Sequence, residues 1–257
     1  MIALPPELLP QLSEGLWHLF VVFLRVSAMV SLLPAFGERS IPTRVKLGID
    51  AAFTLIVAPA VSPPPLEPGL FTVTRMVLTE ILIGVTLGLA LRLFVLALQT
   101  AGSIAAQATS LSQILGGAAA DPVPAMGYLL TLAGLTLAVL LGLHIRVAQF
   151  LIHSYTLFPM GTAPLAADLS QWGVQRIARS FGLAFALAMP FVIASLIYNL
   201  ALGVINRAMP QLMVAFVGAP AITFAGLFLL FAGTPLILSV WSDALFAFML
   251  NPLEGTR

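Results

Sequence analysis

Five polar or proline residues between two long hydrophobic stretches are the clearest candidates for specific chemistry. They are Asn199, Asn206, Arg207, Pro210 and Gln211. Asn199 and Asn206 are two helical turns apart, so both amides project from one stripe of a helix. Such a cluster can bind a solute, but buried amides more often hold helices together. Pro210 should end the incoming helix near Arg207, and a second helix should begin after Gln211.

Residue patterns typical of enzymes or metal sites do not accompany this cluster. His18, His144 and His153 lie far apart, and the chain has no His-Glu-x-x-His, Gly-x-Ser-x-Gly or glycine-rich phosphate-binding motif. His144, expected at a helix end, is more often a packing or capping residue than a ligand. Cysteine is absent, which excludes disulfides and thiol chemistry. We therefore expect no enzyme, no cofactor and no metal.

The elements that position the cluster must be apolar helices. Hydrophobic residues make up 60% of the chain and charged residues 8%, with a mean hydropathy of +1.07, whereas soluble domains carry about 25% charge. The net charge is +1 and the cations are scattered, which argues against nucleic acid as a partner. The acidic N-terminal stretch lacks the basic region of a signal peptide, so the first apolar run should remain in the mature protein.

Six hydrophobic runs approach the roughly 20 residues that cross about 30 Å of hydrocarbon. They are Leu16–Phe36, Val45–Val61, Val77–Leu98, Met126–Leu143, Phe181–Ile205 and Leu212–Phe231. Two shorter runs, Val147–Met160 and Leu236–Leu250, raise the possible number to eight. Prolines such as Pro190 predict kinks and broken, hairpin-like helices. The predicted fold is an all-α membrane protein with six to eight apolar helices, in a single domain over residues 1–257.

Four charged residues lie inside the apolar runs. Arg25, Asp50, Glu80 and Arg92 would each be costly in hydrocarbon, so they must face protein or water. Glu80 and Arg92 are twelve residues apart, about 120° around a helix, and therefore need partners on other elements.

The loop after the first run predicts the orientation of the chain. Arg39, Arg44 and Lys46 outnumber Glu38 there, whereas the N-terminal tail is acidic. The positive-inside rule places this loop in the cytoplasm and the N-terminus outside.

Small residues on the third run predict close helix packing. Gly84 and Gly88 are four residues apart, and Ala97, Ala101 and Ala105 continue the same spacing. The packing partner is either a helix of the same chain or a helix of another subunit.

The stretch from Gln99 to Ala125 is rich in small residues and carries one charge, Asp121. A connection of this length is usually functional or mobile. It is either a plain connector or a plug, since Ile114 and Leu115 beside Gly116 and Gly117 form an apolar tip on a flexible hinge.

Three motifs together resemble the FliR family of flagellar export-gate proteins. They are Glu38-Arg39-Ser40-Ile41-Pro42, the series Asn199, Asn206-Arg207, Pro210-Gln211, and Gly142-Leu143-His144 with Phe158-Pro159-Met160-Gly161. The resemblance extends from end to end of the chain. Leu143 and Ala219 depart from the family pattern, and Leu143 argues against a polar role for the corner before His144.

The resemblance implies a non-catalytic subunit of the flagellar type III export gate, in the bacterial inner membrane at the flagellar basal body. Its implied partners are FliP and FliQ in a helical assembly, FlhB docked outside, exported flagellar proteins as cargo, and membrane lipid. Residues 107–126 would match a mobile plug loop. Virulence injectisomes share the fold, but the forms of the first two motifs favour the flagellar system.

A small-solute permease with a site at the 206–211 break is the alternative, because such sites form where discontinuous helices meet. Permeases of this kind usually contain internal repeats, and none is evident in these 257 residues. Co-purification with two small membrane proteins would favour the export gate.

Overall fold

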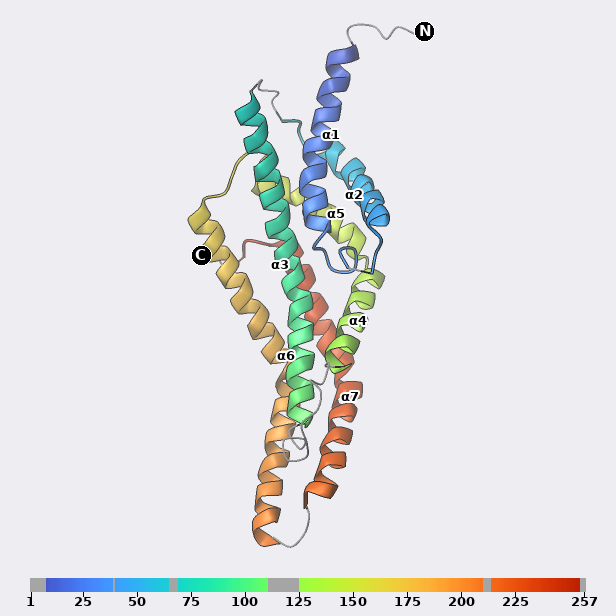
Figure 1. Ribbon diagram of the computed structural model, residues 1–257, viewed down its shortest axis with the longest axis vertical. Helices are drawn as coiled ribbons and strands as arrows, with labels where there is room; N and C mark the ends of the chain where they lie inside the picture. Colours follow the sequence, from blue (N-terminus) through green and yellow to red (C-terminus); the bar gives the residue numbers. More distant parts are fainter. Residues whose placement is uncertain (1–7, 39, 65–68, 111–124, 210–213, 255–257) are drawn as a thin grey trace. The chain divides into compact units, whose positions relative to one another are not determined.

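The computed structural model describes residues 8–38, 40–64, 69–110, 125–209 and 214–254, and the regular secondary structure of these residues is helical (Figure 1). The elements are α1 (Leu8–Val30), α2 (Thr43–Val57), the 3-10 turn η1 (Ala58–Ala60), α3 (Leu70–Ser110), α4 (Ala125–Leu140), α5 (Leu143–Leu157), α6 (Ala166–Ala208) and α7 (Val214–Leu250). They form two compact units. The first comprises residues 1–92, 139–175 and 246–257, and the second comprises residues 93–138 and 176–245.

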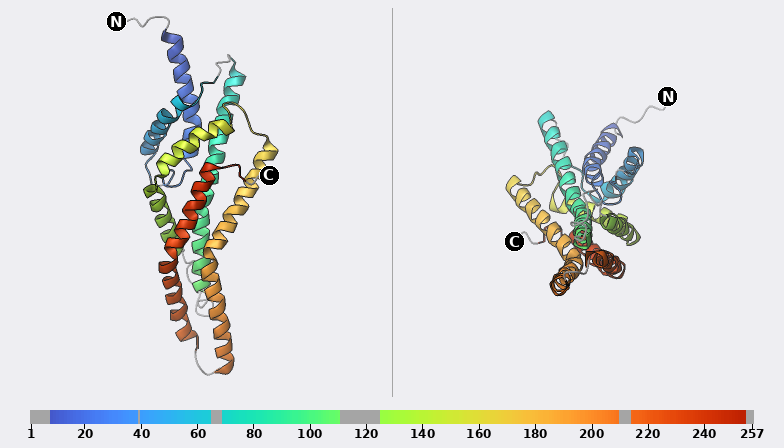
Figure 2. Two further views of the ribbon diagram at one scale, coloured as in Figure 1. Left: turned by 180° about the vertical axis from the view of Figure 1, so that it is seen from behind. Right: turned by 60° about the horizontal axis from the view of Figure 1, so that its bottom comes forward.

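In the first unit, α1 packs against α2 and η1, and α2 packs against α5 (Figure 2). A tight turn reverses the chain after α1: Ala35 has a φ of 67°, and the Gly37 N–H donates to the Leu33 carbonyl at 2.7 Å. A Cβ at Gly37 would lie 2.6 Å from the Ser31 carbonyl oxygen, so only glycine fits there. This turn brings α2 back along α1.

The end of α7 completes the core of the first unit. The ring of Phe248 lies 5.9 Å from that of Phe150 and 6.4 Å from that of Trp172, between ring centroids. Trp172 is buried, and its indole N–H donates to the Pro252 carbonyl at 3.0 Å. These contacts anchor the chain's last described residues.

Small residues let the helices of the second unit approach closely. A Cβ at Gly102 of α3 would come within 2.2 Å of Gly127 of α4, and one at Gly226 of α7 within 2.3 Å of Thr109. Trp241 of α7 is fully buried, and its indole N–H donates to the Phe94 carbonyl at 2.8 Å. The C-terminal part of α3 is thus the common neighbour of α4 and α7.

Fewer helices can cross a membrane than the six to eight expected. Among the described residues, four helices are long and apolar enough, and a fifth span results if α4 and α5, which are bent at a short break, count as one. The run Val45–Val61 is not among them, because its helix α2 has only 15 residues before η1. The break between α4 and α5 occurs at Gly142, whose φ of 82° is a left-handed conformation that favours glycine.

The expected separation of the two apolar runs around Pro235 is wrong, and the kink expected at Pro190 does not interrupt α6. Helix α6 continues through Pro190 and α7 through Pro235, so the runs Leu212–Phe231 and Leu236–Leu250 belong to one helix. Proline is tolerated in apolar helices where neighbouring groups satisfy the freed backbone.

The ends of the expected loop 107–126 are helical. Helix α3 continues to Ser110 and α4 begins at Ala125. The alanines before Ser110 favour helix, and Ala105, Ala106 and Thr109 are buried. The central residues 111–124, including Ile114, Leu115, Gly116 and Gly117, lie outside the described residues.

Candidate functional site

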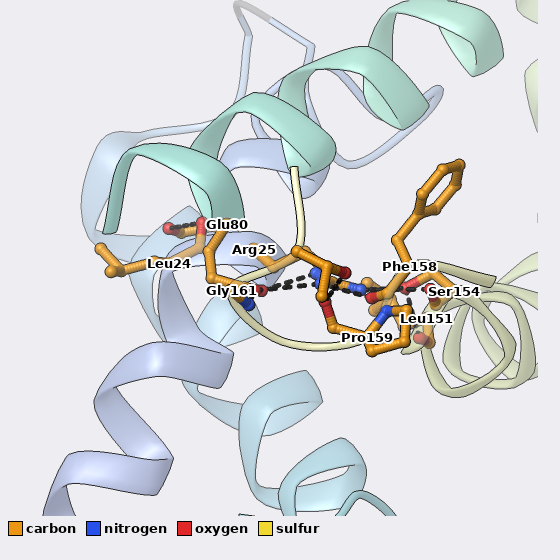
Figure 3. A network of polar contacts seen from close by, with 10 residues as sticks. Leu24, Arg25, Glu80, Leu151, Ser154, Phe158, Pro159 and Gly161 are labelled. Atoms are coloured by element: carbon orange, nitrogen blue, oxygen red, sulfur yellow. Dashed lines mark hydrogen bonds and ion pairs between the residues drawn. The ribbon is translucent and has the colours of Figure 1, made fainter. Parts of the chain in front are cut away.

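A buried ion pair joins α1 to α3 in the first unit. Arg25 and Glu80 are both fully buried, and the Arg25 Nε donates to Glu80 Oε2 at 2.7 Å. The Arg25 Nη2 donates to Glu80 Oε1 at 3.1 Å, which makes the contact bidentate (Figure 3). Two parallel hydrogen bonds of this kind are among the strongest polar contacts in proteins.

The remaining donors of Arg25 bind the C-terminal end of α5. The Nη1 atom donates to the Ser154 carbonyl at 3.2 Å and to the Ser154 hydroxyl at 3.3 Å. The Nη2 atom also donates to the Phe158 carbonyl at 2.9 Å. The Ser154 carbonyl also accepts the Phe158 N–H at 2.9 Å, and the carbonyls at the C-terminal end of a helix carry partial negative charge. A cation from α1 therefore caps α5.

Together these contacts satisfy the whole guanidinium group. Arginine has five N–H donors, and five acceptor contacts are present around Arg25. Glu80 Oε1 accepts one further hydrogen bond, from the Gly161 N–H at 3.1 Å. We call Arg25, Glu80, Ser154, Phe158 and Gly161 the Arg25 clamp. Because its polar groups hydrogen-bond to one another, the clamp is suited to holding α1, α3 and α5 together and not to binding a substrate.

Tyr155 covers one face of the clamp. The Arg25 Cζ lies 3.7 Å from the centre of the Tyr155 ring, a cation–π contact. The Tyr155 hydroxyl is buried and has no hydrogen-bond partner among the described residues. The ring, and not the hydroxyl, is therefore what Tyr155 contributes here.

Glycines on α3 allow this approach to α1. A Cβ at Gly84 would lie 2.5 Å from the Arg25 carbonyl oxygen, and one at Gly88 would lie 2.9 Å from the Met29 carbonyl oxygen. The pair Gly84 and Gly88 thus contacts a helix of the same chain, which was one of the two alternatives predicted.

A second ion pair joins the same two parts of the chain. Arg92 Nη1 donates to Glu38 Oε1 at 2.5 Å, and both side chains are half-buried. In the first pair the cation comes from α1 and the carboxylate from α3, whereas in the second the carboxylate comes from the turn after α1 and the cation from α3. This exchange of charge favours one alignment of α1 with α3. It also agrees with the expectation that Glu80 and Arg92 need partners on other elements.

Asp50 is the fourth charged residue predicted inside an apolar run. It lies on the inner face of α2 with only 9% of its surface exposed, and its Oδ1 has no hydrogen-bond partner among the described residues. Burial raises the pKa of Asp50 from 3.8 to about 6, although the nearby charge of Lys46 lowers the pKa in part. The Lys46 ammonium itself donates to the Gly37 carbonyl at 2.9 Å.

The predicted cluster around Pro210 is only partly described. Asn199 donates its amide to the Ser195 carbonyl at 2.8 Å, within its own helix. Asn206 and Arg207 are exposed in the last turns of α6, which ends at Ala208 and so confirms the predicted helix end. Pro210 and Gln211 lie outside the described residues. No contact joins Asn199 to Asn206 in the described part of the chain.

The other predicted positions lie at the surface or beyond the described ranges. Arg44 is exposed, and Arg39 is not among the described residues. His144 is exposed, whereas Leu143 before it is fully buried in the core. An apolar core residue at this corner agrees with the inference that it has no polar role.

Sequence reasoning missed the partners that complete the clamp. Arg25 is bound by the backbone carbonyls of Ser154 and Phe158 and by the ring of Tyr155. Side-chain type alone does not reveal such roles. The Phe158-Pro159-Met160-Gly161 motif was a usable signal, because Pro159 ends the helix and Gly161, with a φ of 71°, turns its N–H toward Glu80.

The described residues contain no group of histidines and carboxylates able to hold a metal ion. A cavity of about 470 Å³ in the first unit is lined mainly by apolar residues of α3, α6 and the segment between α5 and α6. Its lining includes none of residues 206–211, so it does not support a solute site at the predicted helix break.

Comparison with known proteins identifies similar chains. A family model described as "Bacterial export proteins, family 1" matches residues 16–248. The flagellar biosynthetic protein FliR of Caulobacter vibrioides is 37% identical over 227 residues, which cover 87% of this chain and 90% of that protein. FliR of Escherichia coli is 30% identical over 236 residues, covering 91% and 90%. The Yop proteins translocation protein T of Yersinia pestis is 26% identical over 203 residues, covering 76% and 77%.

Proposed function

The chain belongs to the bacterial export proteins, family 1, and from this membership we propose that it is a non-enzymatic subunit of the flagellar type III export gate. It is a component of the type III protein-export apparatus, with helices able to cross a membrane. The Arg25 clamp is the observation that carries the structural role. Its charges hold helices of the chain together and leave no free donor for a substrate.

We further propose that the chain assembles with FliP and FliQ in the bacterial inner membrane, with FlhB docked outside. Support comes from the large apolar surface of α6, where Phe181 is 64% exposed, Leu196 69% and Leu200 71%. Such a surface needs lipid or other helices to cover it.

Co-expression with these subunits and purification in mild detergent tests the assembly. A stable hetero-oligomer that contains this chain is the expected result. A monodisperse homo-oligomer that binds a small solute would instead favour a permease.

A plug role is proposed for residues Ile114, Leu115, Gly116 and Gly117. A channel wide enough for an unfolded chain needs a compressible apolar closure at rest, and this sequence supplies two aliphatic residues followed by two glycines, a residue type with few conformational restrictions. Deleting Ile114–Ala120 should leave assembly intact and raise ion conductance when the complex is overproduced. Unchanged conductance in a fully assembled complex would show that the partner subunits, and not this segment, close the channel.

Arg207 and Gln211, together with Asn199, Asn206 and Pro210, are proposed as a junction with a neighbouring subunit. Arg207 is exposed at the end of α6, where a cation complements the helix dipole. Arg207→Ala should lower the amount of assembled complex. Normal assembly with altered export kinetics would favour a role in conduction.

The loop that carries Arg39, Arg44 and Lys46 is proposed to face the cytoplasm. A single cysteine at Ser40, in a chain with no other cysteine, should react with impermeant reagents only from the cytoplasmic side. Labelling from the outside alone would show that the loop faces outward and that the proposed topology is wrong.

A further inference from the structure

One carboxylate interrupts an apolar face of α7. The candidate span Ala221–Leu250 contains a single ionisable residue, Asp243. Its side chain is exposed, and no hydrogen bond or ion pair reaches it from the described residues. A carboxylate that faces hydrocarbon is strongly unfavourable, so Asp243 requires a partner or water.

The residues around Asp243 form a stripe along the second unit. Phe228, Leu236 and Val240 are 59%, 69% and 43% exposed, and Ala232 is also exposed. Together with Asp243 they are spaced by three or four residues, which places them on one side of the helix. This is the spacing with which one helix packs along another. We call these five residues the α7 stripe.

Neighbouring hydroxyl groups on α7 are already bonded to its own backbone. The Ser239 hydroxyl donates to the Leu236 carbonyl at 2.9 Å, and the Ser242 hydroxyl donates to the Ser239 carbonyl at 3.0 Å. They leave the Asp243 carboxylate without a donor on its own helix. In apolar surroundings, the partner that best compensates the full negative charge of a carboxylate is a cation.

Other occupants of the stripe fit less well. Acyl chains of lipid have no donor for Asp243. A symmetric contact with a second copy of this chain would bring like charges toward each other. If the stripe faced a water-filled lumen, the apolar side chains of Phe228 and Leu236 would be exposed to water, which is unfavourable.

We infer that the α7 stripe is the binding surface for a membrane helix of another subunit of the export complex. That helix presents a Lys or Arg side chain to Asp243. This inference rests on the proposed function, because that complex supplies the second helix. A single charge in an apolar seam selects both the partner and its alignment, since any other alignment leaves two charges unpaired.

Site-specific photo-crosslinking in the co-expressed complex tests the inference. A crosslinking amino acid at Leu236 is expected to capture a peptide of another subunit that contains Lys or Arg. The matched control is a crosslinker at Phe231, which is 82% exposed but lies about 140° from Leu236 around α7. Phe231 is expected to capture a different peptide or lipid.

Charge variants provide the second arm. Asp243→Leu should lower the yield of the Leu236 crosslink by about tenfold, because the binding constant for the partner helix falls when the ion pair is lost. Asp243→Lys combined with exchange of the captured Lys or Arg for Asp should restore the crosslink, which a misfolded variant would not do. Asp168→Asn, which alters an exposed carboxylate in the first turn of α6, should leave the yield unchanged.

Three results would overturn the inference: capture of lipid alone at Leu236, capture of a second copy of this chain, or an unchanged yield in Asp243→Leu. If other subunits co-purify and one of these results is found, only the inference about α7 fails. If no other subunit co-purifies with the unaltered chain, the proposed function fails as well.

Discussion

A Cβ at Gly84 would lie 2.5 Å from the carbonyl oxygen of Arg25 and 2.8 Å from the Cβ of Ala28. The ion pair between Arg25 and Glu80 depends on this proximity, because Glu80 lies one helical turn before Gly84 on α3. Backbone and side chain thus act together: the glycine sets the distance between the helices, and the charges bind across it.

Gly84→Ala should destabilise the protein by about 1 to 3 kcal/mol, the usual cost of overpacking, because the Arg25 backbone carbonyl that the new Cβ would meet cannot move without separating α1 and α3. Thermal unfolding in detergent would measure the loss. The control is Gly48→Ala on α2, where a Cβ meets nothing within 4 Å and where alanine favours helix by up to about 1 kcal/mol. Equal stability of the two variants would contradict the tight packing at Gly84.

Arg25→Met should cost about 3 to 5 kcal/mol, because it leaves the buried Glu80 carboxylate without its cation. Glu80→Leu should cost a similar amount for the reverse reason. The double variant should lose less than the sum of the two, since neither charge is then left unpaired. The unfolding free energies of the four proteins give the coupling, and simple additivity would show that the two residues act independently.

Asp50→Asn should remove a pH dependence of stability. Because the pKa of Asp50 is raised from 3.8 to about 6, the folded protein holds this proton more tightly than the unfolded chain. Stability therefore falls as pH rises from about 4 to about 6, by on the order of 2 to 3 kcal/mol, and stays at the lower level above this range. The Asn variant should lack this loss and be the more stable protein at pH 8.

Lys46→Met is the companion variant for Asp50. Removing the cation that lowers the pKa of Asp50 should move the loss of stability to higher pH. Unfolding curves measured from pH 4 to pH 8 would locate the transition. A shift to lower pH, or no shift, would show that the ammonium of Lys46 does not act on Asp50.

Tyr155→Phe should be neutral or stabilising, because it keeps the ring beside Arg25 and removes a buried hydroxyl without a partner. Tyr155→Leu should cost about 0.5 to 2 kcal/mol through loss of the cation–π contact, in addition to lost packing. Denaturation in detergent distinguishes the two variants. A clear loss of stability in Tyr155→Phe would assign the hydroxyl a partner.

The sequence predicted the all-helical membrane class, the end of α6 near Arg207 and the need of Glu80 and Arg92 for partners elsewhere. It did not identify those partners. Arg25 and Glu80 are 55 positions apart, and Arg25 also binds backbone carbonyls, which every residue carries. Pairing over such distances depends on how helices pack, which hydrophobic runs alone do not specify.

The number of membrane segments was overestimated for a related reason. The hydrophobic runs on either side of Pro235 were counted as separate segments, but α7 continues through this proline. Breaks instead follow from local geometry, such as the left-handed Gly142 between α4 and α5 and the turn at Gly37 after α1. Those glycines are hard to distinguish in sequence from the packing glycines Gly84 and Gly102.

Trp172 and Trp241 are both buried, and each donates its indole N–H to a backbone carbonyl, but they belong to different units. The chain therefore carries a separate fluorescent reporter in each unit. With Trp17 replaced by Phe, removing either of the two remaining indoles leaves emission from one unit alone. The red shift that accompanies exposure of a buried indole would then show, for each unit in turn, whether it loosens first when the protein is heated.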